Sequence, residues 1–415
     1  MSATPTTQPP SALSHSALSA LRFKNFRLYF IGQVISLSGT WMQSVAQGWL
    51  VYHLTQSELA LGIVACAAGL PALLLSPVAG VVVERWPRRS ILIYAQTGQM
   101  ILAFVLAALT ATNTVQVWHI VLLAFLLGVT NAVDAPARQI IIKDMVGAEN
   151  LPSGIALNAI INNASRVVGP AAAGLVLTQI GPTWCFFVNG LSFLAAILML
   201  VVIHVQTLVV KHAQFAPMAR LREGVAFARH HATLRTLLLM TVVASLFTGN
   251  INTLLPAYAD TVLHSPKEGF AALSTATGAG AVLAAMLIPV FGRRFGRGWV
   301  VTVMGAFTLL SGVVVALTSD LTMATVFMAI NGFALIMQFT TVNTLIQSEV
   351  PDEFRGRVLS LYTLSWFGLS PFGALILGVV AQGIGAPAAI LIYTLIGGVL
   401  GGYVVLRSRE TRQLW

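Results

Sequence analysis

The sequence predicts an all-α membrane protein with twelve transmembrane helices in two pseudo-symmetric bundles of six. Composition is the first reason: hydrophobic residues make up 57% of the chain and charged residues only 9%, whereas about a quarter of the residues of a soluble domain are charged. The second reason is that the apolar residues form runs of roughly 20 or more, the length needed to cross a bilayer. The third is a repeat that relates the two halves of the chain.

Twelve apolar runs lie between turn and charge signals. We expect each to be a helix, because a span must satisfy its own backbone polar groups in lipid and no run alternates as a barrel strand does. Numbered one to twelve in chain order, the runs are 27–53, 60–82, 91–112, 117–137, 153–180, 183–205, 237–262, 269–291, 299–318, 321–346, 356–383 and 387–406. They divide the chain into a cytoplasmic tail at 1–26, a first bundle at 27–205, a linker at 206–236, a second bundle at 237–406 and a cytoplasmic tail at 407–415.

The linker contains one amphipathic stretch. Its apolar stripe consists of Met218, Leu221, Val225 and Ala228, and basic residues occupy the other positions. This pattern predicts a helix that lies at the membrane surface.

Two segments resemble each other 204 positions apart: ENLPSGIALNAIINNASRVVGPAAAGLVLTQIG at 149–181 and EFRGRVLSLYTLSWFGLSPFGALILGVVAQGIG at 353–385. In this alignment Gly169 falls on Gly373 and Gly174 on Gly378. The alternative explanation is that apolar segments of similar composition match by chance. If the repeat is real, two bundles can rock about a site between them, which is the architecture of a carrier.

Lysines and arginines occupy every second loop, and the loops between them are nearly bare apart from Lys267. This is the positive-inside pattern of a chain with both termini in the cytoplasm. Basic loops that face an anionic leaflet account for the net charge of +10, so we expect no nucleic-acid partner. The polar, proline-rich N-terminal tail predicts disorder and no cleaved signal peptide. Cys66 and Cys185 suggest neither a disulfide framework nor a metal site.

The sequence GVVVERWPRR at 80–89 resembles the loop signature of the major facilitator superfamily, with Glu84 where aspartate is usual and Pro87 where glycine is usual. The equivalent loop of the second half, FGRRFGRG at 291–298, keeps the arginines but lacks the acid. The runs DAPARQ at 134–139, RVVGPAAAG at 166–174 and PDEFRGRV at 351–358 resemble the enterobactin-exporter-like branch, the transmembrane secretion effectors. The resemblance implies the major facilitator fold and a bacterial inner-membrane exporter of siderophores, drugs or other small amphipathic compounds.

Charged residues at the inner ends of the spans face one another if adjacent inner loops pack together. We expect a cytoplasmic gate made of Glu84, Arg85, Arg88, Arg89, Arg138, Asp144, Glu149, Arg293, Arg294, Glu349 and Glu353. An exposed ion pair contributes only about 0–1 kcal/mol, but a network of pairs can bias an equilibrium between two conformations. The alternative is that these arginines only set the orientation of the spans in the membrane.

Span one carries a polar stripe in which Gln33, Ser36, Thr40, Gln43 and Gln47 follow one another at helical spacing. Amides that face lipid are costly, so we expect the stripe to face a cavity or a neighbouring helix. Positions on other spans extend the predicted substrate cavity: Asn131, Asn158, Asn162, Arg166, Asn252, Gln338 and Trp366. Hydrogen bonding between helices is the alternative role for these residues.

Two ionisable residues fall within the predicted hydrocarbon region. Arg166 lies about thirteen residues into span five, and such residues usually pair with an acid or line a water-filled cavity. We therefore expect Arg166 to attract an anionic group of the substrate or to take part in proton coupling. Asp134 is the second proton-coupling candidate, and its alternative role is to pair with Arg138 one turn away.

These observations predict a secondary active transporter of the bacterial inner membrane that exports siderophore-like or drug-like molecules by alternating access, in exchange for protons. The proton gradient would be its energy source, without any cofactor or metal. Its partners would be a small-molecule substrate, protons and the lipid bilayer, and we expect a monomer. The spans contain no catalytic constellation and no phosphate-binding loop, so we expect no enzyme. The alternative function is a proton-coupled importer of a small metabolite, because the fold does not set direction.

Overall fold

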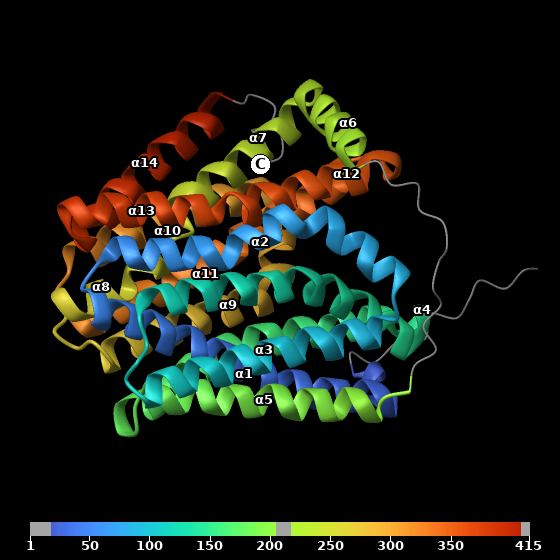
Figure 1. Ribbon diagram of the computed structural model, residues 1–415. Helices are drawn as coiled ribbons and strands as arrows, with labels where there is room; N and C mark the ends of the chain where they lie inside the picture. The colour runs from blue at the N-terminus through green and yellow to red at the C-terminus, as the bar shows by residue number, and fades with distance from the viewer. Residues whose placement is uncertain (1–17, 205–216, 408–415) are drawn as a thin grey trace, which may run out of the picture.

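The computed structural model describes residues 18–204 and 217–407, and within these ranges every regular element is helical (Figure 1). This confirms the predicted all-α class. The residues up to 204, termed the N-terminal half, form α1 (Lys24–Thr55), α2 (Glu58–Arg85), α3 (Arg88–Ala111), α4 (Val117–Gln179) and α5 (Pro182–Val202). The residues from 217, termed the C-terminal half, form α6 (Pro217–His230), α7 (Ala232–Val243), α8 (Leu255–Thr261), α9 (Glu268–Arg294), α10 (Arg297–Leu317), α11 (Leu321–Glu349), α12 (Asp352–Thr363), α13 (Ser370–Ile384) and α14 (Ala386–Arg407).

Ten helical stretches of the described residues are long and apolar enough to cross a membrane. The longest, α4, has 63 residues and contains both of the predicted spans 117–137 and 153–180. Its helix breaks at Gly147, where φ is 74° and ψ is 173°, a conformation that glycine adopts without strain. The 32-residue α1 is not one of the ten, because its polar stripe lowers its mean hydropathy.

Two spans of the C-terminal half are broken midway. Between α7 and α8 the chain passes through a π turn at Ala244–Thr248 and a 3-10 turn at Ile251–Leu254, and between α12 and α13 it passes through a π turn at Leu364–Gly368. Side chains compensate for the disturbed backbone: the Ser245 hydroxyl donates to the Trp366 carbonyl at 2.6 Å, and Asn250 Nδ2 donates to the Ser245 carbonyl at 2.6 Å. Irregular backbone at membrane depth is tolerated where protein groups satisfy it in this way.

The aligned glycines of the two halves make equivalent contacts. A Cβ atom at Gly169 would lie 2.8 Å from the Ser38 carbonyl oxygen of α1, and one at Gly373 would lie 2.8 Å from the Ser245 carbonyl oxygen. Each glycine therefore lets its helix touch the first span of its own half. These are the contacts that a structural repeat of the two halves predicts.

The second pair of aligned glycines makes contacts between the halves. A Cβ atom at Gly174 would lie 2.8 Å from Ala271 Cβ of α9, and one at Gly378 would lie 2.8 Å from the Glu58 carbonyl oxygen of α2. The N-terminal half thus contacts the C-terminal half along two seams, one between α4 and α9 and one between α2 and α13. The small residues at both seams allow the helices to approach closely.

The two ends of the molecule are packed differently. The arginine-rich turns, among them those between α2 and α3 and between α9 and α10, lie at one end, termed the basic end; the other is termed the opposite end. At the opposite end a single buried core unites both halves, with Leu50 and Leu177 packing in the same cluster as Tyr258 and Leu273. At the basic end the buried cores are separate, one within the N-terminal half and two within the C-terminal half.

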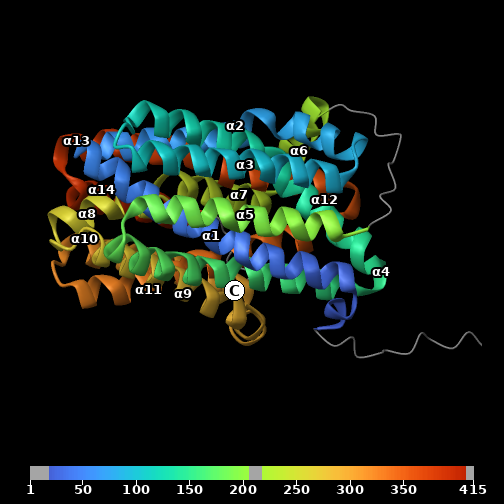
Figure 2. The same ribbon diagram turned by 60° about the horizontal axis from the view of Figure 1, so that its bottom comes forward.

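Figures 1 and 2 show the ribbons of the two halves, the N-terminal half in blue to green and the C-terminal half in lime to red. Toward the basic end, on the right of Figure 1, α2 bends away from α12. Leu73 of α2 packs against Gly368 in the π turn that follows α12. Among the described residues, the halves therefore share one buried core at the opposite end and have separate buried cores at the basic end.

Polar contacts reinforce the joint at the opposite end. The Gln382 side-chain oxygen of α13 accepts hydrogen bonds from the Ser57 hydroxyl at 2.6 Å and from the Leu59 backbone N–H at 3.2 Å, both at the start of α2. The Lys267 ammonium lies 5.2 Å from the centre of the Trp49 ring, a distance that gives a cation–π attraction. Lys267, the one exception to the charge pattern of the loops, therefore links the two halves.

We expect Gln382→Leu to open the opposite end more often. It removes two hydrogen bonds, each of which contributes about 0.5–1.5 kcal/mol. The fraction of molecules with this end open should therefore rise by a factor of about five or more. The measurement is the rate at which an impermeant maleimide labels a single cysteine at Gln47, beside the joined core, in variants without Cys66 and Cys185. Gln179→Leu, an exposed glutamine at the same end, is the control. An unchanged labelling rate in Gln382→Leu would show that these bonds do not hold the joint.

Candidate functional site

Arg166 lies on the second part of α4, at the boundary between joined and separate packing. Its guanidinium carbon is 5.3 Å from the centre of the Trp41 ring of α1. Its backbone touches the other half, because a Cβ atom at Gly278 of α9 would lie only 2.1 Å from the Arg166 carbonyl oxygen. Toward the opposite end, Leu177 belongs to the united core; toward the basic end, Asn162 is exposed.

Polar residues continue from Arg166 toward the basic end along the same helix. Asn158 is half-buried, and the Asn162 side-chain amide donates to the Asn158 carbonyl at 2.8 Å. The hydroxyls of Ser38 and Ser165 lie 3.3 Å apart between α1 and α4. Backbone and neighbouring hydroxyls thus satisfy part of this polar surface, and the rest is exposed.

The C-terminal half contributes aromatic and amide groups. The Trp366 ring is half-buried and lies 4.9 Å from the Phe339 ring, centroid to centroid. Gln338 is also half-buried, and its amide lies next to Gly305 of α10. Asn252 is exposed in the irregular segment before α8. The sequence singled out these residues for a cavity, and a direct contact with substrate stays a prediction.

The polar stripe of α1 bonds largely within the N-terminal half. Gln33 accepts a hydrogen bond from Arg138 of α4, and Gln43 accepts one from the Asn189 amide of α5 at 2.7 Å. The Thr40 hydroxyl donates to the Ser36 carbonyl at 2.9 Å. In the structure, Gln33 and Gln43 therefore join helices, which was the alternative role of the stripe, while Thr40 and Gln47 are half-buried.

Asp134 and Arg138 form a buried ion pair. Arg138 Nε lies 2.5 Å from Asp134 Oδ2, and the Asp134 residue is only 3% exposed. One turn away, Asn131 accepts a hydrogen bond from Gln99 of α3 at 3.0 Å. The structure thus pairs Arg138 with Asp134 and Gln33 inside the N-terminal half, although the sequence suggested a place for Arg138 in the gate.

Several gate residues bind within one half. Arg88 Nη1 of α3 lies 3.1 Å from Asp144 Oδ2 of α4. Arg89 donates to the carbonyls of Leu200 and Val201 at 2.8 and 2.7 Å, where a cation neutralises the negative end of α5. Of the remaining gate residues, Arg85, Glu149, Arg294, Glu349 and Glu353 are exposed, and the side chains of Glu84 and Arg293 lie outside the described residues.

The linker helix α6 packs on the basic end of α12. Arg357 Nη1 lies 3.1 Å from Glu223 Oε2, and the rings of Phe227 and Phe354 stack with centroids 4.4 Å apart. Ala228 of the predicted stripe is buried, whereas Val225 is 40% exposed; the side chains of Met218 and Leu221 lie outside the described residues. Helical spacing therefore predicted the helix and its buried Ala228, whereas Val225 of the same stripe stays exposed.

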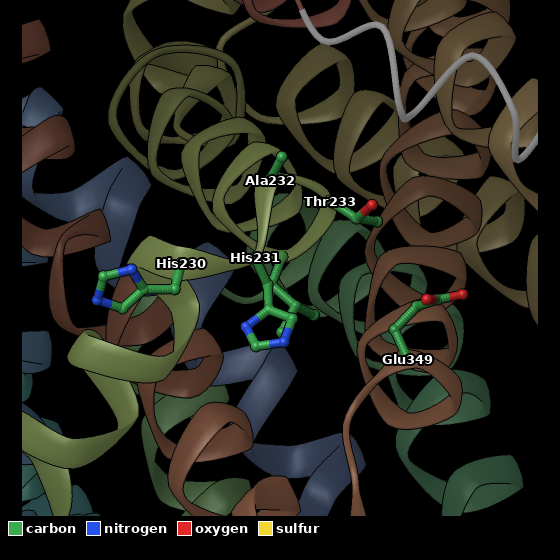
Figure 3. Close-up of a pocket in the computed structure, with 6 residues that line it drawn as sticks. His230, His231, Ala232, Thr233 and Glu349 are labelled. Carbon is green, nitrogen blue, oxygen red and sulfur yellow. The ribbon is translucent and has the colours of Figure 1, made fainter.

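A surface depression lies beside the junction of α6 and α7, lined by His230, His231, Thr233 and Glu349 (Figure 3). The two imidazoles and the carboxylate point in different directions. Across the described parts of the chain, no group of three or more histidine, cysteine, aspartate or glutamate residues could hold a metal ion. This depression therefore offers no convergent binding site.

Known proteins are similar in sequence to this chain along most of its length. The chain is 23% identical over 361 residues to the staphyloferrin A transporter of Staphylococcus aureus, covering 86% of this chain and 89% of that one. It is 25% identical to the multidrug efflux pump Tap of Mycolicibacterium fortuitum, covering 90% and 93% of the two chains, and 23% identical to macrolide efflux protein A of Streptococcus pyogenes, covering 88% and 92%.

Solved structures share the fold. The nucleoside transporter NupG superposes with a TM-score of 0.76 at 12% identity, covering 92% of this chain and 98% of that one. A bacterial homologue of the iron transporter ferroportin, in an inward-facing state, gives 0.65 at 18% identity, covering 93% and 99%. The sequence model of the protein family named transmembrane secretion effectors matches residues 15–413 of the chain. The chain is therefore a multi-pass membrane transporter, not an enzyme, and belongs to this family within the major facilitator superfamily.

Proposed function

We propose that this transporter exports small amphipathic molecules from the bacterial cytoplasm across the inner membrane by alternating access, in exchange for protons. The observation that carries the proposal is the unequal packing of the ends: one core unites the halves at the opposite end, and separate cores fill them at the basic end. Two repeated bundles that rock about a central site pass through such a state.

The proposed topology has twelve spans in two bundles of six, with both termini in the cytoplasm. Ten stretches qualify by length and composition; α1 adds one, and dividing α4 at Gly147 adds another. By the positive-inside rule the basic end faces the cytoplasm. The state described here would then admit substrate from the cytoplasm, which is the loading step of an exporter.

The proposed residue roles follow from these placements. The residues that would contact substrate lie next to the joined core or between it and the basic end: Arg166, Asn158, Asn162 and Trp366. Arg88–Asp144 and the other charged residues of the basic end would rearrange as that end closes. Asp134 and Arg166 stay the proton-coupling candidates, with the proton gradient as energy source, no cofactor, and a monomer in the bilayer as the working unit. Relatives named as efflux proteins support export.

Proton release from inverted membrane vesicles tests this proposal. Vesicles that hold an acidic interior receive a panel of drugs, dyes and catecholates, and a fluorescent dye reports the gradient. We expect some compounds to collapse the gradient in vesicles that contain the protein and not in vesicles without it. If no compound does so while the protein is folded, the importer becomes the better function, and uptake into whole cells is the next measurement.

A further inference from the structure

We propose that Arg166 and Trp41 form the contact that receives the negatively charged group of the substrate, so that the transported class is amphipathic organic anions. This inference rests on the proposed export function and names its substrate class. The guanidinium carbon of Arg166 lies over the face of the Trp41 ring, 5.3 Å from the centre of the ring.

Arg166 differs in its partners from the partly buried arginines whose side-chain contacts the structure gives, since Arg89 donates to two backbone carbonyls and three others pair with carboxylates. Arg88, Arg138 and Arg357 each form an ion pair. Among the residues that the structure describes, the side chain of Arg166 has only the contact with Trp41. A cation held at membrane depth without a counter-ion is costly, and an anionic ligand that enters the site would remove that cost.

The contact with Trp41 leaves the hydrogen-bonding capacity of Arg166 unused. The ring attracts the positive charge through its face, and it engages none of the five N–H donors of the guanidinium. Those donors form a planar fork that matches a carboxylate or a phosphate. Trp41 therefore holds Arg166 in place without filling the positions that an anion would take.

The position of Arg166 couples such a ligand to the change of conformation. The Arg166 carbonyl lies at the seam between the halves, where only glycine fits at position 278. This seam must separate when the opposite end opens. An anion bound to Arg166 would therefore be held while the basic end is open and would be released as the seam parts.

In the alignment of the two halves, only the N-terminal half has a charged residue at the position of Arg166. Position 370 corresponds to Arg166 in the second half and is a serine, whose hydroxyl donates to Asn250 Oδ1 at 2.9 Å. Position 366 corresponds to Asn162 and is a tryptophan packed on Phe339. One half thus offers a cation and the other an aromatic surface, a combination that suits a ligand with one anionic group and an apolar body.

The test is binding of two probes of the same shape, 2-naphthoate and 2-naphthamide, to the full-length protein in lipid nanodiscs, measured by calorimetry. We expect naphthoate to bind about tenfold or more tightly than the amide, since a hydrogen bond to a charged group contributes enough to change affinity by that factor. Arg166→Gln should abolish the preference without changing the binding of naphthamide. Arg166→Lys should keep part of it, and Arg222→Gln, an exposed arginine on α6, should keep all of it.

Three results would overturn the inference: equal affinity for the two probes, a preference that survives Arg166→Gln, or no binding of naphthoate at millimolar concentration. Export in inverted vesicles separates this failure from failure of the proposed function. If wild-type vesicles export neutral or cationic compounds while the two probes bind the protein with equal affinity, the exporter stands and only the anion site is removed. If vesicles with the wild-type protein show no gradient-driven flux of any compound, the proposed function itself is wrong.

Discussion

Gly278→Val and Gly280→Val are expected to fail in different ways, although the two positions are only two residues apart on α9. A Cβ atom at Gly280 would lie 1.8 Å from the Ala329 carbonyl oxygen of α11, within the C-terminal half. A Cβ atom at Gly278 would lie 2.1 Å from the Arg166 carbonyl oxygen of α4, in the other half. Gly280→Val should therefore damage one half, whereas Gly278→Val should damage the seam between the halves.

For Gly280→Val we expect a loss of about 3 kcal/mol or more, at the upper end of overpacking costs, because backbone atoms block the new side chain. The purified protein should unfold at a lower temperature or fail to accumulate. For Gly278→Val we expect an unfolding temperature near that of the wild type, because the halves can separate without unfolding. The two halves should no longer close at this seam. If this destabilises the closed seam by about 1.4 kcal/mol or more, transport should fall about tenfold or more.

Thermal unfolding in detergent, vesicle transport and maleimide labelling at Gln47 distinguish the two outcomes. Leu283→Val, at a position 55% exposed on the same helix, is the control and should change none of them. If Gly278→Val unfolds as early as Gly280→Val, the seam is part of the folding core. If Gly278→Val transports normally, the described seam does not form in the working cycle.

The sequence was sufficient for the all-α class and for ten long apolar helical stretches, because the length and hydropathy of a run require a helix in lipid whatever its neighbours are. The alignment of the two halves also placed Gly169 on Gly373, and these glycines make equivalent contacts. It did not reveal the broken segments at Ala244–Thr248 and Leu364–Gly368. Those breaks depend on hydrogen bonds between residues more than 100 positions apart, such as that between Ser245 and Trp366.

Partners of the polar residues could not be read from the sequence. Spacing places Gln33 and Gln43 on one face of α1, but it does not say that Arg138 and Asn189 meet them there. Arg89 was expected in a gate, and it also binds the carbonyls that end α5. A periodic pattern identifies the buried face of a helix, whereas the partner depends on the crossing of helices that are distant in sequence.

The buried pair of Asp134 and Arg138 gives the second large prediction. Asp134→Leu or Arg138→Met alone should lower the free energy of unfolding by about 3–5 kcal/mol, because each leaves its former partner buried without a counter-charge. The double variant should regain most of this loss, because well-packed apolar side chains can replace a buried pair at little cost. Thermal unfolding of the two single variants and the double variant, compared as a double-mutant cycle, measures the coupling.

Transport by the stable double variant separates a structural role from a coupling role. A pair that only joins helices leaves a double variant that exports against a proton gradient as the wild type does. A pair that carries the coupled proton leaves a double variant that still exchanges labelled for unlabelled substrate at equal pH, since exchange needs only alternating access. That variant would no longer concentrate substrate when a proton gradient is imposed. Asp134 is enclosed with Arg138 in the structure, so a coupling role further requires that Asp134 become accessible in another conformation. Loss of exchange in a double variant that unfolds at the wild-type temperature would contradict both roles and would place the pair in the conformational change itself.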